Sequence, residues 1–150
     1  MTDTAPPVGG RTIGLAHYAG RAVLERVLAR HGATFQQQIT LRAAVAADGP
    51  LERGALVEQV TDALKTEAAD VHATVDGLLA VGLLTADGPL VRPTDAGREL
   101  FAAVGAETGE ISARIYAGIP PEDLATTGRV LARVTERAEA ELAELTRAAR

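Results

Sequence analysis

The stretch that decides the fold is residues 69–100, ADVHATVDGLLAVGLLTADGPLVRPTDAGREL. Its first part is typical of an amphipathic helix, because Val71, Val75 and Leu78 recur at spacings of four and three residues. Gly82 follows, and glycine adopts the left-handed conformation that closes a helix without strain. The pattern therefore predicts a helix that ends just before Gly82.

A short hairpin is predicted after this helix, which we place over residues 67–81. Asp87-Gly88-Pro89 is a strong turn signal with apolar residues on both sides, so the hairpin spans residues 83–92. Pro93 prevents the next helix from extending backward, and Thr94 offers its N-cap. The predicted order is helix, two-stranded hairpin, helix.

Further helices are predicted on both sides of this stretch. Upstream, apolar residues recur at helical spacing over residues 12–31, 34–47 and 51–64. Downstream, a helix over residues 100–118 is broken by prolines, and a last helix runs over 121–145. All of these helices are amphipathic, so each needs a partner surface for its apolar face.

The last helix has an apolar seam that is close to a heptad pattern. Its members are Leu124, Thr127, Leu131, Val134, Ala138, Leu142 and Leu145. Together with the long first helix, this seam offers more apolar surface than a monomer of this size can bury. We therefore predict a two-fold symmetric homodimer in which the first, fifth and sixth helices of both chains interdigitate.

The composition favours a single helical domain in the cytoplasm. The chain has 150 residues, of which 47% are hydrophobic but only 3% aromatic, so Ala, Leu and Val build the core. The lack of cysteine excludes a disulfide scaffold and a thiolate metal site. The chain also lacks an apolar run long enough for a membrane span and the pattern of a signal peptide. The net charge of −5 is unfavourable for nucleic-acid binding unless the basic residues cluster on one face.

The order of these motifs resembles the multiple-antibiotic-resistance-regulator (MarR) family of repressors over nearly the whole chain. L-x-A-x-G-L-L at 78–84 and T-D-A-G-R-E-L at 94–100 are similar to that family's recognition helix with its wing and to the following helix. Residues 31–43 and 51–60 are similar to its second and third helices. The spacing over 60–71 is a few residues longer than the family pattern, so the turn there is either lengthened or partly helical.

The resemblance implies a mainly α, winged helix-turn-helix fold with long terminal dimerisation helices and a short two-stranded wing. Residues 1–10 are expected to be a disordered tail, and residues 11–150 a single domain. Within that domain, residues 11–33 and 98–150 are expected to supply the dimerisation helices. Residues 34–97 are then the DNA-binding lobe.

The resemblance also implies a ligand-responsive transcriptional regulator, expected to be a repressor. It would read double-stranded DNA at a pseudo-palindromic operator through helix 67–81 and wing 83–92. The candidate DNA contacts are Lys65, Thr66, His72, Thr74, Arg92, Arg42 and Arg53. Arg92 is expected either to reach a phosphate or to pair with Asp95 or Asp87.

The predicted recognition helix departs from the family at its exposed positions. Where such repressors commonly have arginine, this chain has Ala73 and Gly77, and Asp70 and Asp76 repel phosphate. His72 is then either a base-reading residue or a solvated surface residue. These departures favour an alternative function, namely a winged-helix protein with weakened DNA affinity that acts as a ligand-binding or protein-interaction module, in the manner of an antirepressor.

In proteins that this chain resembles, small aromatic ligands bind where the first, second and fifth helices meet. The corresponding candidates here are His17, Tyr18, Arg21, Phe35, Arg42 and Tyr116. The two tyrosines have a second interpretation, because tyrosine commonly fills a subunit interface with its hydroxyl at the rim.

No enzyme is predicted from this sequence. It has no G-x-S-x-G nucleophile motif, no phosphate-binding lysine loop and no H-E-x-x-H zinc motif. The three histidines, His17, His31 and His72, are too scattered to indicate a metal site, and no cofactor is predicted.

Overall fold

The computed structural model describes residues 4–150, so the first three residues of the predicted tail lie outside the described part. The described part is predominantly helical. Its elements are α1 (Gly10–Arg30), α2 (Phe35–Ala46), β1 (Leu51–Glu52), α3 (Arg53–Leu64), α4 (Ala68–Ala80), β2 (Leu84–Asp87), β3 (Leu90–Pro93), α5 (Asp95–Tyr116) and α6 (Pro121–Ala148). None of the helices within residues 4–150 is long and apolar enough to cross a membrane.

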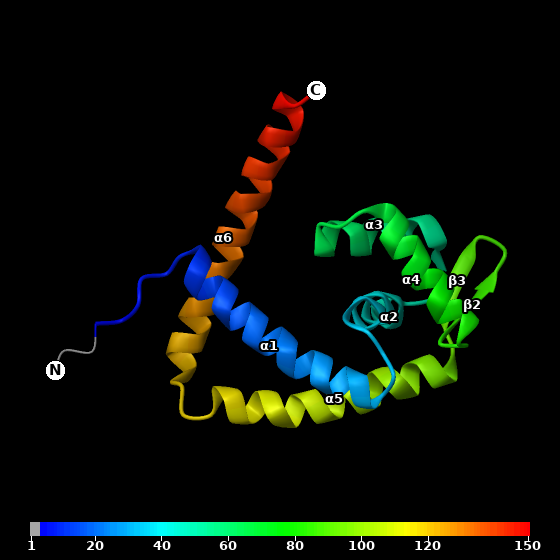
Figure 1. Cartoon of the computed structure of the whole chain (residues 1–150), viewed down its shortest axis with the longest axis horizontal. Helices are drawn as coiled ribbons and strands as arrows, with labels where there is room; N and C mark the ends of the chain where they lie inside the picture. Colours follow the sequence, from blue (N-terminus) through cyan, green and yellow to red (C-terminus); the bar gives the residue numbers. More distant parts are fainter. Residues whose placement is uncertain (1–3) are drawn as a thin grey trace. The chain divides into compact units, whose positions relative to one another are not determined.

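The chain forms two compact units. The first ends at Ile111 and contains α1 to α4, the three strands and most of α5 (Figure 1). The second begins at Ser112 and contains the end of α5 together with α6. The helix-turn-helix and the hairpin therefore belong to one unit.

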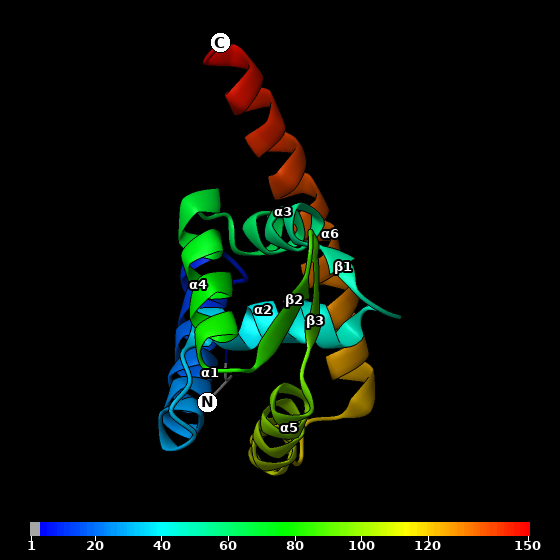
Figure 2. The same ribbon diagram turned by 90° about the vertical axis from the view of Figure 1, so that its right-hand side faces the viewer.

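The core of the first unit lies where α2, α3 and α4 pack against the hairpin (Figure 2). The three residues of α4 that the sequence predicts to face inward, Val71, Val75 and Leu78, are all buried. They pack with Leu41 of α2 and Leu56 of α3, which are also buried. Truncation of such a buried leucine to alanine costs about 2–5 kcal/mol, so this inward face holds α4 firmly and leaves its opposite face to solvent.

Helix α1 packs against the first half of α5 through a second, smaller cluster. Val27, Leu28 and Val104 are buried in it. Nearer its N-terminus α1 is uncovered, and Leu15 and Tyr18 are 58% and 67% exposed. Only part of the apolar stripe of α1 is therefore buried against other residues of the described chain.

The sheet has one more strand than the predicted wing. Residues Leu51 and Glu52 form β1, so the prediction of a helix from Leu51 to Leu64 is corrected and α3 begins at Arg53. The strand order is β1-β3-β2 and both pairings are antiparallel, with Leu51 opposite Val91. The physical reason is that β3 has a second edge of unpaired backbone groups, which β1 satisfies.

A close-packed corner joins the end of α4 to the start of α5. The Thr94 hydroxyl donates a hydrogen bond to the Gly82 carbonyl oxygen at 2.6 Å and accepts one from the Gly97 N–H at 3.0 Å. A Cβ atom on Gly97 would lie 2.1 Å from the Leu83 carbonyl oxygen, so only glycine fits there. The predicted cap at Thr94 is confirmed, and it also ties α5 to the chain that leaves α4.

Two local signals set the start of α2 and the turn between α3 and α4. Thr34 caps α2 in a capping box with Gln37, in which each side chain bonds to the other residue's backbone N–H. Lys65 ends α3 in the left-handed conformation, with φ of 51°. Because α3 stays helical to Leu64 and α4 begins at Ala68, the turn between them consists of Lys65, Thr66 and Glu67, none of which is helical.

The second unit consists mainly of α6. Pro121 occupies its first turn, with Glu122 and Asp123 beside it, as the sequence predicts. None of the α6 residues is buried. The large apolar side chains of its seam are exposed in the single chain: Leu131, Val134, Leu142 and Leu145.

Candidate nucleic-acid interface and the adjoining cleft

Helix α4 presents an exposed face that has no lysine or arginine. The exposed positions of its predicted outward set are Ala69, Asp70, His72, Ala73 and Asp76. Gly77, also predicted to face outward, is half-buried near the Gln37 side chain. Between Ala68 and Ala80 there is no lysine or arginine, so α4 itself offers hydrogen-bonding groups and acidic charge.

Arg53, at the start of α3, bonds to this face of α4. Its Nη2 atom donates to Asp76 Oδ1 at 2.7 Å and to the His72 carbonyl oxygen at 3.2 Å. Its Nε atom donates to His72 Nδ1 at 3.3 Å. The ion pair offsets the negative charge of Asp76, and it also fixes the His72 ring with Nδ1 as a hydrogen-bond acceptor.

The backbone of Arg53 also contacts the hairpin. Its N–H donates to the Pro89 carbonyl oxygen at 2.9 Å, in the turn that joins β2 to β3. One residue therefore connects the first turn of α3 to both α4 and the tip of the wing. The sequence predicts Arg53 only as a contact to the DNA backbone, and it gives no signal for these internal bonds.

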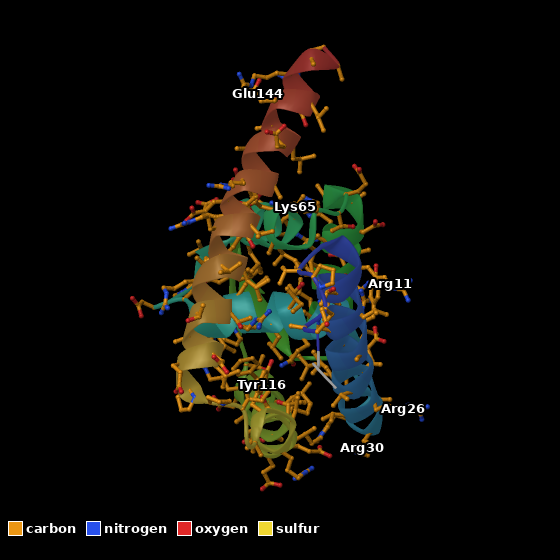
Figure 3. All side chains as sticks on the ribbon, turned by 90° about the vertical axis from the view of Figure 1, so that its left-hand side faces the viewer. Arg11, Arg26, Arg30, Lys65, Tyr116 and Glu144 are labelled. Carbon is orange, nitrogen blue, oxygen red and sulfur yellow. The ribbon has the colours of Figure 1, made fainter. Side chains whose placement is uncertain are left out.

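Lys65 and Thr66 lie in the turn of the helix-turn-helix, and Thr74 lies in the middle of α4. Lys65 pairs with Asp62 at 3.1 Å and projects from the turn after α3 (Figure 3). Thr66 follows it in that turn and is half-buried. The Thr74 hydroxyl donates to the Asp70 carbonyl oxygen at 3.0 Å, so its remaining capacity is that of an acceptor.

Arg42 on α2 and Arg92 on β3 are exposed. Arg92 stands opposite Thr85 in the hairpin. Within residues 4–150 neither arginine has an ion pair or a side-chain hydrogen bond, and Arg92 pairs with neither Asp87 nor Asp95. Both guanidinium groups are therefore available to an external partner.

The predicted cationic contacts are spread along the unit. Arg53 and Lys65 stand at opposite ends of the 12-residue α3, which is about 18 Å long at the usual rise per residue. Such a spacing suits contacts with separate phosphates better than the binding of one compact anion.

The predicted ligand-binding residues are brought together only in part. The Arg21 guanidinium lies over the Phe35 ring, 4.1 Å from its centroid, and joins α1 to α2. His17 and Tyr18 form an edge-to-face pair on the exposed side of α1, with ring centroids 5.7 Å apart. Arg42 lies on the surface of α2, and Tyr116 belongs to the second unit.

A cleft of about 440 Å³ lies between α1, α2, α3 and α4, and we call it the α1–α4 cleft. It contains Arg21 and Phe35 from the predicted ligand set and Thr66 and Thr74 from the predicted DNA set. Its other lining residues are Thr34, Gln36, Thr40, Val60, Leu64, Asp70, Val71 and Ala73. The two predicted sets therefore share one cavity, and that cavity adjoins the exposed face of α4.

The sequence does not point to Thr40, the most enclosed polar residue of this cleft. Its side chain is fully buried, and its hydroxyl has no hydrogen-bond partner within residues 4–150. The available signal was its helical register, because the buried Ala44 lies four residues later.

Within the same described residues no group of three or more His, Asp or Glu side chains is placed to hold a metal ion.

Comparisons with known proteins agree with this architecture. No protein-family profile and no curated protein matches the sequence. Among solved structures, the transcriptional regulator PA3341 is similar at a TM-score of 0.73 and 20% identity, over 87% of this chain and 97% of that one. A MarR-family transcriptional regulator from Rhodococcus sp. RHA1 is similar at a TM-score of 0.70 and 18% identity, over 83% and 90%.

A third structure is CouR from Rhodococcus jostii RHA1 bound to p-coumaroyl-CoA, with a TM-score of 0.70 and 19% identity, over 83% of this chain and 89% of that one. In all three, the match covers more than four-fifths of this chain. This protein has the winged-helix fold of the MarR-family transcriptional regulators.

Proposed function

We propose that this protein is a DNA-binding transcriptional regulator in which α4 enters the major groove and the β2–β3 hairpin contacts the adjacent backbone. The observation that carries the proposal is the set of Arg53 bonds, which hold α4 and the wing tip to the same turn of α3. A reading helix and a wing fixed in this way meet a duplex as one body, and fixed placement of this kind is what base readout requires.

In this proposal His72 reads a base, Asp76 holds Arg53, and the scattered cations bind phosphates. A histidine can take part in donor or acceptor contacts at base edges. Lys65, Arg42 and Arg92 supply phosphate contacts. The resulting affinity is modest, because few cations release few counterions.

The functional unit in this proposal is a homodimer that binds a pseudo-palindromic operator and acts as a repressor in the cytoplasm. The support is the apolar seam of α6, which remains exposed in the single chain, together with the uncovered stripe of α1. A small-molecule response is part of the same proposal, and the α1–α4 cleft beside α4 supports it.

The test is a fluorescence-anisotropy titration with DNA that flanks the protein's own gene, at low and at moderate salt. We expect saturable binding whose affinity falls steeply with salt, with a logarithmic slope of roughly 0.9 per phosphate contacted. A duplex of the same composition but scrambled order is the control, and it should bind more weakly at both salt concentrations.

A second candidate function is a winged-helix module that binds a ligand or a protein in place of DNA. The observation that favours it is the exposed face of α4, which has two aspartates and no lysine or arginine. In the same titration, this function predicts no detectable binding even at low salt. That result would overturn the DNA-binding proposal.

A further inference from the structure

The exposed apolar residues in the second half of α6 are arranged symmetrically about Ala138. Val134 and Leu142 lie four residues before and after it, and Leu131 and Leu145 lie seven residues before and after it. Residues at these spacings lie on one side of a helix, so all five share a face. The four large side chains are between 37% and 67% exposed. This face therefore shows the same apolar pattern in both directions along the chain.

The charges of α6 reverse at the same place. Residues 124–137 include three arginines and one glutamate, whereas residues 138–148 include three glutamates and one arginine. Two copies of α6 in antiparallel alignment place the basic half of each helix beside the acidic half of the other, but a parallel alignment places like halves together. The opposed helix dipoles add to this preference. The charge pattern thus favours an antiparallel second copy.

An antiparallel alignment with Ala138 opposite its own copy also satisfies the apolar pattern. Leu131 then stands opposite Leu145 of the partner subunit, and Val134 stands opposite Leu142 of the partner subunit. The two helices come closest where they cross, and alanine is small enough to allow a close approach there. One two-fold axis at Ala138 therefore accounts for both the apolar and the charged residues.

A surface groove on α6 fits the most exposed of these leucines. The groove has a volume of about 350 Å³ and is lined by Thr126, Arg129, Val130, Arg133, Val134 and Arg137. In the antiparallel alignment the partner's Leu145 stands opposite Leu131, which is next to Val130 in the chain. Packed helices insert a protruding side chain of one into a depression on the other. The groove supplies such a depression for a leucine that is 67% exposed in the single chain.

Arg137 and Glu141 lie on the same edge of the seam, because each directly precedes one of its members, Ala138 and Leu142. Equal edges face each other in an antiparallel pair. Residue 139 of the second copy is level with Arg137, and Glu141 of that copy is only about 3 Å further along the axis. Within residues 4–150 neither Arg137 nor Glu141 has an ion pair or a side-chain hydrogen bond. Each side chain is therefore available to the other's copy.

We propose that α6 recognises a second copy of this chain by crossing it antiparallel at Ala138, with Arg137 of each copy paired to Glu141 of the other. The inference rests on the homodimer of the proposed function, and it adds the orientation, the crossing point and the residues that select the partner. Two-fold symmetry forms the ion pair twice. A chain with a different charge pattern along this helix would meet like charges and be rejected.

The first experiment mixes two charge-reversal variants, Arg137→Glu and Glu141→Arg. Each variant alone places like charges opposite each other, whereas the mixed dimer has an opposite-charge pair at both sites. We expect each variant alone to dimerise at least about tenfold more weakly than the parent. In the mixture, native mass spectrometry should show a heterodimer fraction well above the roughly one half that random exchange gives. Random exchange in this mixture would overturn the proposal.

Arg129→Glu and Glu136→Arg are the matched control pair. They precede the seam residues Leu131 and Ala138 by two positions, a rotation of about 200°, and therefore lie on the far side of the helix. We expect their mixture to exchange randomly. An equal preference for the heterodimer in both mixtures would contradict the proposed ion pair.

A second experiment tests the orientation with single cysteines, which the parent chain lacks. Ala138→Cys should form a disulfide with its own copy on oxidation with diamide. Leu131→Cys and Leu145→Cys should not do so alone, because equal positions are about 21 Å apart along the axis, but a mixture of the two should link. Disulfide formation by Leu131→Cys alone would indicate parallel helices and overturn the proposal. Non-reducing electrophoresis separates these outcomes.

The outcomes also separate this interface from the proposed function. A parent dimer with random exchange in the Arg137→Glu and Glu141→Arg mixture would reject the interface and leave the dimer of the proposed function standing. The expected heterodimer and disulfide pattern, without DNA binding in the anisotropy titration, would support the interface and reject the DNA-binding function alone. A monomeric parent protein would reject both the interface and the dimer.

Discussion

At the scale of single residues, the contact between Gly97 and Leu83 is the tightest constraint in the first unit. A Cβ atom at position 97 would lie 2.1 Å from a backbone oxygen, which cannot move as a flexible side chain can. We expect Gly97→Ala to lower the free energy of unfolding by about 1–3 kcal/mol or more, as overpacked sites do. Urea denaturation followed by circular dichroism measures this change.

Gly105→Ala is the matched control, because Gly105 lies on the same helix and a Cβ atom there would meet open space. Alanine there should stabilise α5 by roughly 0.5–1 kcal/mol, since glycine is a poor helix former. If both variants shift the unfolding midpoint in the same direction, the close contact at Gly97 is not the cause.

Asp76 is the second residue with a testable role, because its carboxylate holds Arg53. Asp76→Asn removes one negative charge from the proposed DNA-facing surface and, in the proposed complex, frees Arg53 for a phosphate. We expect DNA affinity at low salt to rise about fivefold, equivalent to roughly 1 kcal/mol. Anisotropy titration measures it, and Asp48→Asn, an exposed change in the loop after α2, is the charge-matched control.

A weaker affinity in Asp76→Asn would contradict this balance of charges. It would mean that the carboxylate contributes more by accepting a bond from a base than it loses by repulsion. The same titration against operator variants with single base-pair changes would then identify the base.

At the scale of elements, the capping box fixes the start of α2, which packs against both helices of the helix-turn-helix, α3 and α4. Thr34→Ala leaves the Gln37 N–H without its acceptor, so we expect a loss of about 1 kcal/mol in unfolding free energy. Thr34→Ser keeps the hydroxyl and should restore most of that stability. Equal losses in the two variants would show that the threonine methyl group, and not the cap, is responsible.

Elements that depend on residues close in sequence were predicted better than the one element that depends on a distant partner. Helical periodicity and turn chemistry correctly predicted α4, the hairpin and the Thr94 cap, because these depend on residues close in sequence. Strand β1 was missed, since Leu51 and Glu52 become a strand only where the edge of β3, some 40 residues later, is available to pair. Short strands have too few residues to show a period of their own.

For the candidate site, the sequence predicted individual residues but not the contacts between them. Charge and side-chain chemistry singled out Arg53, His72, Arg21 and Phe35. The bonds from Arg53 to α4 and the stacking of Arg21 on Phe35 depend on how separate helices pack. The enclosed hydroxyl of Thr40 likewise depends on packing, because a threonine within an apolar run has no signature that distinguishes a bonded side chain from an unbonded one.

At the scale of the whole molecule, the exposed seam of α6 predicts a homodimer. The double variant Leu131→Glu/Val134→Glu places charge on two of its exposed apolar positions. We expect light scattering to give twice the 15.5 kDa of one chain for the parent protein and the single-chain mass for the variant. Burial of unpaired carboxylates in an apolar interface is the physical reason.

Ala140→Glu adds the same type of charge to α6 outside the seam and should leave the dimer intact. A parent protein that is monomeric at micromolar concentration would refute the predicted assembly. Dissociation of the Ala140→Glu protein would instead place the interface on a different face of the helix.

Arg53 forms hydrogen bonds with both its main chain and its side chain, and these two kinds of bond respond differently to substitution. Its bond to Pro89 comes from the main chain and survives any replacement except proline, whereas its bonds to His72 and Asp76 belong to the side chain. Shortening the side chain therefore loosens α4 and keeps the hairpin tip anchored. In the proposed complex with DNA, substitutions at this one site would change how rigidly α4 is held without changing the hairpin.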